Sequence, residues 1–136
     1  MENKRYCESI AKEIQGCIDG HMRTCPECNE WFFDDEIDEN DIACKWCKEA
    51  FELDEAEPVS LYDYFADCYD IEYRVGIDKG IRSVCAMVAC GGPNIYVDTG
   101  SGDVELYWGG DRARYPLTSE SVAAIDDYFA DIYNCL

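Results

Sequence analysis

The sequence has few basic residues, a single histidine and no long apolar run. Its 136 residues include 30 Asp and Glu but only 11 Lys and Arg, which gives a formal net charge of −19. A field of this strength repels nucleic acid and anionic membranes and attracts basic partners. No stretch approaches the roughly 18 apolar residues of a membrane helix, and no signal peptide begins the chain. We therefore expect a cytoplasmic protein that binds no membrane and no nucleic acid directly.

A catalytic set of residues is also missing. His21 is the only histidine, so a cysteine nucleophile would have a single imidazole to serve as its base. The glycine clusters at 91–92, 100–102 and 109–110 match neither the phosphate-binding loop nor the dinucleotide fingerprint. An enzyme would need a substrate-sized pocket lined by polar groups. We predict that the protein is not an enzyme.

Cysteine, by contrast, is abundant, and four of the ten cysteines have the spacing of a metal site. Cys25-Pro26-Glu27-Cys28 is followed fifteen residues later by Cys44-Lys45-Trp46-Cys47. Two CxxC pairs at this separation predict coordination by four thiolates, most simply of tetrahedral Zn²⁺. Protein then fills every coordination position, which leaves none for a reacting water. We expect a structural metal, held by Cys25, Cys28, Cys44 and Cys47.

Iron in a rubredoxin-like site is the alternative, because thiolates also bind iron. Asn29 and Lys48 stand where rubredoxin-like knuckles usually have glycine, and a gap of fifteen residues is short for that fold. Both features favour a zinc ribbon. A reducing compartment leaves the other cysteines as free thiols that behave as small apolar residues, namely Cys7, Cys17, Cys68, Cys85, Cys90 and Cys135.

Hydrophobic periodicity predicts three helices. Residues 2–19 place an apolar stripe on one helix face, formed by Tyr6, Ile10, Ile14, Cys17 and Ile18. A short helix runs from about Ser60, its N-cap, to Tyr69, with Tyr62, Phe65 and Tyr69 as its apolar side. The last helix begins near Ser119 with Thr118 as N-cap, and its stripe consists of Val122, Ile125, Phe129, Ile132 and Leu136.

Between the last two helices the hydrophobic period changes to two, which predicts strands at 71–77, 81–90, 95–98 and 104–108 and a short edge strand near 113–115. The fold class is therefore α+β, an antiparallel meander of four or five strands packed by N- and C-terminal helices, with an inserted zinc-ribbon module. We divide the chain into an N-terminal helix at 1–20, a four-cysteine zinc ribbon with an acidic loop at 21–57, and an α+β domain at 58–136.

The acids are concentrated in the first half of the chain. Residues 27–57 hold 13 of them against two lysines, and six lie in the loop 34–41. The motif Asp-Tyr-Phe-Ala-Asp occurs at 63–67 and again at 127–131, and on a helix its two aspartates share one face. We predict that these acids contact a basic partner: Asp34, Asp35, Glu36, Asp38, Glu39, Asp41, Asp63, Asp67, Asp127 and Asp131.

The two CxxC pairs and the segments Met87–Asp98, Glu105–Trp108 and Ala124–Phe129 carry a resemblance to a known group of proteins. The chain resembles small acidic, zinc-ribbon-containing proteins encoded on phages and mobile elements of Gram-positive gut bacteria. This resemblance implies a genetic setting that is rich in inhibitors of host restriction and CRISPR systems. It supplies no functional residues.

Two functional hypotheses follow. In the first, the protein is an anti-defence inhibitor, an anti-CRISPR or antirestriction protein. As an acidic DNA mimic it occupies the basic nucleic-acid-binding surface of a host nuclease or CRISPR effector. In the second, it is a zinc-ribbon adaptor that contacts host transcription or replication machinery through Trp31, Phe32, Phe33 and Trp46. Charge reversal should abolish binding in the first case, and loss of the aromatic side chains in the second.

Overall fold

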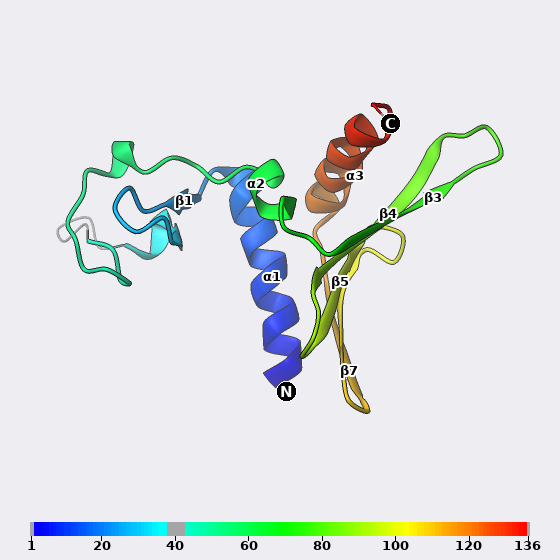
Figure 1. Ribbon diagram of the computed structural model, residues 1–136, viewed down its shortest axis with the longest axis horizontal. Helices are drawn as coiled ribbons and strands as arrows, with labels where there is room; N and C mark the ends of the chain where they lie inside the picture. Colours follow the sequence, from blue (N-terminus) through cyan, green and yellow to red (C-terminus); the bar gives the residue numbers. More distant parts are fainter. Residues whose placement is uncertain (1, 38–42, 136) are drawn as a thin grey trace.

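Two long amphipathic helices lie at the two ends of the chain in the computed structural model, which describes residues 2–37 and 43–135 (Figure 1). Helix α1 (Glu2–Asp19) buries Cys7, Ala11 and Ile14, which recur at helical spacing. Helix α3 (Ser119–Tyr133) buries Ile125 and Phe129, and the hydroxyl of its N-cap, Thr118, accepts a hydrogen bond from the Ser121 amide. Within the described residues, no helix has both the length and the apolarity needed to cross a bilayer.

The sheet has five antiparallel strands whose spatial order follows the chain, β3-β4-β5-β6-β7. Their bounds are β3 (Asp70–Val75), β4 (Ile81–Ala89), β5 (Asn94–Asp98), β6 (Asp103–Trp108) and β7 (Asp111–Pro116). The prediction of an α+β meander with helices at both ends is confirmed, and the fifth strand is longer than expected. The division of the chain into three parts remains a prediction.

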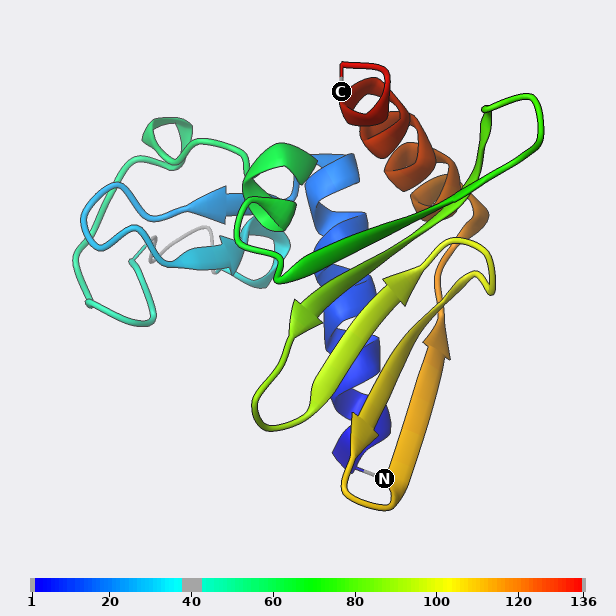
Figure 2. The ribbon, with the colours of Figure 1, turned by 45° about the vertical axis from the view of Figure 1, so that its right-hand side comes forward.

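Both long helices cover the same face of the sheet (Figure 2). Helix α1 packs across β6 and β7, and α3 packs against β4. Alternate strand residues point to this face and form one core with the helices, which includes Val84, Ala86, Ile95, Val97, Val104 and Leu106. The core is therefore sandwiched between one sheet and two helices.

The opposite face of the sheet carries polar side chains, many of them in ion pairs. Arg74 donates to both carboxylate oxygens of Asp98, at 2.9 Å each. Burial alone would raise the pKa of Asp98, but hydrogen bonds from Arg74 and the Gly100 amide outweigh it and lower that pKa. Arg114 similarly lies 3.6 Å from Asp103 and 3.3 Å from Glu105. The few cations of this half of the chain are thus largely used within the fold.

The cysteine-rich segment forms a separate lobe at one end of the long axis of the molecule (Figure 1). It contains the antiparallel pair β1 (Met22–Thr24) and β2 (Trp31–Phe33), and the short helices η1 (Asp34–Glu36) and η2 (Leu53–Glu55). The chain returns along β1, where Thr24 N–H donates to Glu57 O and Val59 N–H donates to Met22 O. We call residues 22–37 and 43–59 the cysteine lobe.

Two details of the helix predictions are wrong. Helix α2 spans only Leu61–Phe65, and the chain turns before Tyr69. Tyr62 and Tyr69, expected on an apolar side, are 68% and 64% exposed. Only Phe65 enters the core, where its ring meets that of Phe129 at 5.1 Å. Tyr6 of α1 is also exposed, because Cys7 takes the buried position at that turn.

Gly16 fixes the approach of β2 to α1. A Cβ added at Gly16 would lie 2.7 Å from Cε1 and 3.2 Å from Cδ1 of Phe33. The absence of a side chain therefore lets the Phe33 ring rest directly on the helix. This contact connects the cysteine lobe to the rest of the fold.

We predict that Gly16→Ala destabilises the protein, although alanine is the better helix former by about 1 kcal/mol. The added methyl forces Phe33 off α1, and overpacking of this kind costs about 1–3 kcal/mol. Urea unfolding should therefore show a net loss of stability. In a Phe33→Leu background the same change should become neutral or stabilising, because the shorter side chain relieves the clash. An equal loss in both backgrounds would show that the contact is unimportant.

Candidate metal centre

Each CxxC pair folds into the same tight turn, or knuckle. In the first knuckle, Cys25 N–H donates to Glu30 O at 2.8 Å and Asn29 N–H donates to Cys25 O at 3.0 Å. In the second knuckle, Cys44 N–H donates to Glu49 O at 3.0 Å and Lys48 N–H donates to Cys44 O at 2.9 Å. Two equivalent turns therefore present two thiols each toward a common centre.

The four sulfur atoms lie at the separations that a single ion requires. All four lie within 4.8 Å of one another. The Sγ atoms of Cys25 and Cys47 are 3.8 Å apart, and those of Cys28 and Cys44 are 3.6 Å apart. Tetrahedral sites with metal–sulfur bonds of about 2.3 Å have sulfur–sulfur distances of about 3.8 Å. The predicted residues are thus brought together, and the cluster could hold a metal ion such as zinc.

Backbone amides support negative charge on these sulfurs. Glu27 N–H points at Cys25 Sγ at 3.4 Å, and Trp46 N–H points at Cys44 Sγ at 3.3 Å. Burial opposes ionisation of Cys44, but the amides of Cys47 and Trp46 outweigh it and bring its pKa to about 7. A backbone hydrogen bond from Glu30 lowers the pKa of Cys28, but burial and the neighbouring thiols outweigh it and raise this pKa to about 12. An incoming cation would therefore displace protons that the crowded thiols otherwise retain.

Both knuckles use a left-handed residue directly after the second cysteine. Asn29 has φ 65° and Lys48 has φ 66°, in the region that glycine adopts most easily. The presence of Asn29 and Lys48 in place of glycine was one reason to predict a zinc ribbon and not a rubredoxin-like iron site. That reason fails, because the backbone adopts the same conformation without glycine.

Not all acids of the predicted acidic loop are exposed and unpaired. Asp34 is largely buried: its Oδ2 accepts from Arg23 Nε at 2.9 Å, and its Oδ1 lies 2.8 Å from His21 Nδ1. Asp35 and Glu36 are exposed on η1. The other predicted acids of this loop, Asp38, Glu39 and Asp41, lie outside the described residues.

The repeated Asp-Tyr-Phe-Ala-Asp motif has two different structures. Asp63 caps α2: its carboxylate accepts from Ser60 N–H at 3.1 Å, while Ser60 Oγ accepts from Asp63 N–H. Asp67 lies beyond the end of α2, so the prediction that both share a helix face is wrong there. Asp127 and Asp131 are exposed on α3, where that prediction is confirmed.

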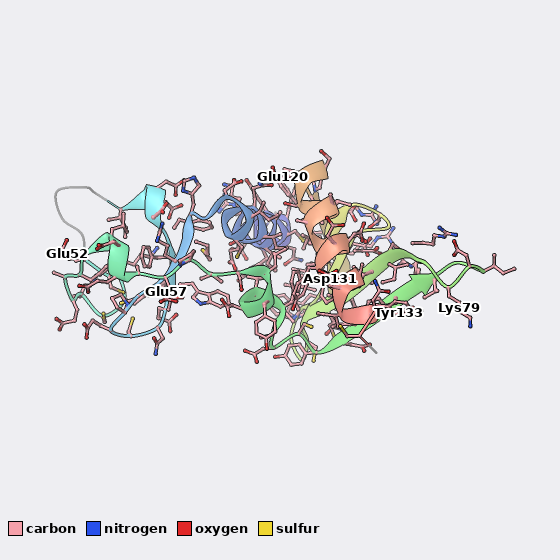
Figure 3. The ribbon with its side chains drawn as sticks, turned by 90° about the horizontal axis from the view of Figure 1, so that it is seen from above. Glu52, Glu57, Lys79, Glu120, Asp131 and Tyr133 are labelled. Atoms are coloured by element: carbon pink, nitrogen blue, oxygen red, sulfur yellow. The ribbon has the colours of Figure 1, made fainter. Side chains whose placement is uncertain are left out.

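The largest group of exposed acids in the cysteine lobe was not predicted as a contact surface. Its members lie on the knuckles and on the segment after them, and all have exposed side chains and no ion pair within the described part of the chain. Figure 3 shows Glu52 and Glu57 on this lobe, far from Asp131 on α3. We call this group the lobe acids: Glu27, Glu30, Glu49, Glu52, Asp54, Glu55 and Glu57. The high frequency of acids between residues 49 and 57 was the feature of the sequence that could have indicated this group.

The four aromatic residues of the adaptor hypothesis all line one hollow of about 770 Å³ between α1 and the second knuckle. Three of them also pack internally. Trp31 stacks on Tyr64 with ring centroids 5.8 Å apart, and Phe32 meets Phe51 at 5.5 Å. Only Trp46 is highly exposed, at 57%. These aromatics therefore form walls of a cavity and not a flat exposed patch.

No family model, curated protein or solved structure matches this chain. Functional inference therefore rests on the residues of the protein and their geometry.

We predict that Lys48→Gly stabilises the metal-loaded protein by about 0.5–1 kcal/mol, because glycine adopts positive φ without the cost that a side chain imposes. Urea unfolding with zinc bound would measure the gain. Lys45→Gly is the matched control, an exposed lysine of the same knuckle without positive φ. It should lose stability through added chain entropy. A similar effect of both changes would contradict the assigned knuckle geometry.

A pH dependence is expected from the contact between His21 and Asp34. The hydrogen bond and charge of Asp34 raise the pKa of His21 above 6.5. The stabilisation is complete below 6.5 and is lost as the pH rises through the raised value. His21→Gln should therefore cost stability at about pH 6 and little at about pH 8.5, by urea unfolding of the zinc-loaded protein. In an Asp34→Asn background this difference should vanish. A cost that grows with pH would contradict the assigned ion pair.

Proposed function

We propose that the four cysteines hold Zn²⁺ as a structural ion. The support comes from the sulfur separations, the absence of a free coordination position in a four-thiolate set, and the short spacing between the two pairs. Four thiolates around Zn²⁺ carry a net charge of about −2, so the metal would add to the acidity of the lobe. Iron(III) would give about −1 and a visible absorption band, which distinguishes the two ions.

We further propose that the protein is an inhibitor that binds the basic nucleic-acid-binding surface of another protein and acts as an acidic DNA mimic. The observation that carries this proposal is the set of seven lobe acids, all exposed and without ion pairs in the described residues. Of the eight cations outside the lobe, four are held in ion pairs within the described residues, namely Lys12, Arg74, Arg82 and Arg114. The lobe is thus the part of the chain with the most uncompensated negative charge, which attracts basic surfaces over long range.

The partner that we propose is a host nuclease or CRISPR effector, met in the cytoplasm of a bacterial host. The resemblance to proteins of phages and mobile elements supports this setting, as does the lack of a recognisable catalytic set. Surfaces that bind nucleic acid are rich in Lys and Arg, and their affinity comes mainly from phosphate neutralisation. Closely spaced carboxylates on an ordered lobe present a similar charge. That the protein is not an enzyme remains part of this proposal.

The test is a pull-down of purified nucleases and CRISPR effectors with the zinc-loaded protein. Neutralising Glu49, Glu52, Asp54 and Glu57 to the corresponding amides should weaken capture at least tenfold. The matched control neutralises four exposed acids outside the lobe that are not among the predicted contacts, Glu2, Asp70, Glu72 and Asp111, and changes the net charge equally. If the lobe carries the contact, the control should have a much smaller effect.

Salt dependence is the second measurement. Capture should fall steeply between about 50 mM and about 500 mM NaCl, because screening shortens the range of the attraction. Binding that ignores salt would exclude the charge-mimic mechanism. Equal loss in both four-acid variants would show that only the net charge matters, and would remove the lobe from the proposal.

The adaptor function is retained as a second candidate because of one observation. Trp31, Phe32 and Phe33 of β2 and Trp46 of the second knuckle are brought to a single hollow by two separate segments of the chain. Convergence of aromatic side chains on a cavity of this size is typical of a recognition site. In this candidate function, the hollow and not the acidic surface would engage the partner.

A further inference from the structure

We propose that the free edge of β3 binds the same edge of a second copy of this chain. The two β3 strands pair antiparallel about a two-fold axis at Tyr73, which joins the two sheets into one and keeps all helices on one face. This inference concerns a different surface from the lobe acids and does not rest on the proposed inhibitor function.

Strand β3 has backbone groups to offer, because it is the first strand of the sheet and pairs only with β4. Thr99 N–H donates to Val84 O, so the amide and carbonyl of Val84 face β5 and those of the next residue, Cys85, face β3. Cys85 is opposite Glu72, whose groups therefore point to β4. The groups that point outward belong to the alternate residues Ile71, Tyr73 and Val75.

The other edge of the sheet is protected against such pairing. Leu117 N–H donates to Gly102 O, so the preceding residue, Pro116 of β7, faces outward and has no N–H to donate. Self-pairing of β7 near its centre would also set one arginine opposite another, because Arg112 and Arg114 are both outward residues. Proline and like charges are common devices against edge pairing, and β3 contains no proline.

Exposed apolar side chains gather at the β3 edge. Eight large apolar side chains are exposed in the described residues, and three of them belong to β3 or flank it. Tyr69, Val75 and Ile77 are 64%, 43% and 104% exposed. The turn that carries Ile77 is closed by a hydrogen bond from Lys79 N–H to Gly76 O at 2.9 Å. Figure 1 shows this β3–β4 hairpin projecting from the rest of the molecule.

Charge selects one register for the paired strands. With Tyr73 opposite Tyr73 of the second copy, Glu72 comes opposite Arg74, and Ile71 comes opposite Val75. A shift by two residues in either direction sets Glu72 opposite Glu72, or Arg74 opposite Arg74. The β3 edge is thus complementary to itself in one alignment.

The same alignment provides a second contact between opposite charges. Asp70 comes opposite Gly76 of the second copy, on the polar face of the sheet. The guanidinium of Arg82 lies over Gly76, because a Cβ added there would be 2.7 Å from Arg82 Cζ. Asp70 of each copy therefore meets Arg82 of the other. Each half of the interface gains two contacts of this kind.

The internal ion pairs of these arginines leave donors free. Within the described residues, Arg74 donates through its two Nη atoms and Arg82 through one. A guanidinium has five N–H groups, and the Nε–H of each remains. The two side chains are 48% and 61% exposed. The acids that they would meet have no ion pair in the described part of the chain, namely Asp70 and Glu72.

The helices and the lobes leave room for this contact. Helix α3 packs against β4, and the β4 strands of the two copies would be three strand spacings apart, about 14 Å. Packed helices need only about 8–10 Å. Figure 3 shows Glu52 of the lobe and Lys79 of the hairpin at opposite ends of the molecule. Antiparallel pairing therefore points the two lobes in opposite directions and keeps their acids apart.

Sedimentation equilibrium of the full zinc-loaded chain tests the inference. We expect a mass of twice 15.5 kDa that falls toward that of one chain on dilution. Glu72→Arg should weaken association about tenfold, because it sets an arginine opposite Arg74. Asp111→Arg is the matched control, an exposed acid of β7 with the same change in charge. It should not weaken association, since it lowers the repulsion between two acidic chains.

A second pair of variants tests the apolar contact. Ile77→Ser should also weaken association, whereas Tyr6→Ser, at an exposed aromatic residue of α1, should change it less than about twofold. Both side chains are exposed, so neither change should disturb folding.

Amide hydrogen exchange measured by NMR tests strand pairing directly. The amides of Tyr73 and Val75 should be protected in the dimer and should exchange faster after Glu72→Arg. Those of Glu72 and Arg74 point to β4 and should be protected in both proteins.

A single-chain mass at every concentration would overturn the inference, as would equal losses in the variants and their controls. Oligomers that keep growing with concentration would reject the closed two-fold contact. Protection without alternation along β3 would reject strand pairing. Neutralising the four lobe acids should leave the dimer intact while it weakens capture of a basic partner. Failure of the acidic-surface proposal and failure of this one are therefore distinguishable.

Discussion

The shared centre of four sulfur atoms is the contact on which the cysteine lobe depends. This lobe has few fully buried residues, namely Met22, Cys25, Cys44, Ala56 and Val59, and two of them are cysteines of that centre. So small an apolar core cannot offset the entropy of ordering the chain together with the repulsion among its carboxylates. A metal ion that joins the two knuckles would supply the missing constraint. Without such a cross-link, the lobe acids would have no fixed arrangement to present.

Ion pairing differs between the sheet and the cysteine lobe. In the sheet region, three of the five cations are held in ion pairs, as in the Arg74 contact with both oxygens of Asp98. That region also has a continuous apolar core and needs no cross-link. In the cysteine lobe, the exposed carboxylates outnumber the available cations, and Arg23 is already held by Asp34. Repulsion is tolerated where it points outward into solvent, which is the arrangement expected of a surface that meets a basic partner.

The lobe and helix α1 together form two surfaces, one acidic and one aromatic with mixed charge. The lobe acids project outward, while the hollow gathers aromatic rings together with three cationic and three acidic residues. The hollow depends on the packing of Phe33 against Gly16, because this contact sets where β2 lies relative to α1. A partner could engage one surface without covering the other.

The sequence alone determined the features that depend on local spacing. Two CxxC pairs implied one metal-binding cluster, alternating residues implied the antiparallel strands, and Ser60 and Thr118 were identified as N-caps. Which acids remain free was decided only by the tertiary structure. Asp34 pairs with Arg23, whose position depends on strand pairing, and Asp63 is used as a cap because α2 is short. The convergence of Trp46 with β2 likewise requires the closure of both knuckles, since periodicity records neighbours along the chain and not contacts across it.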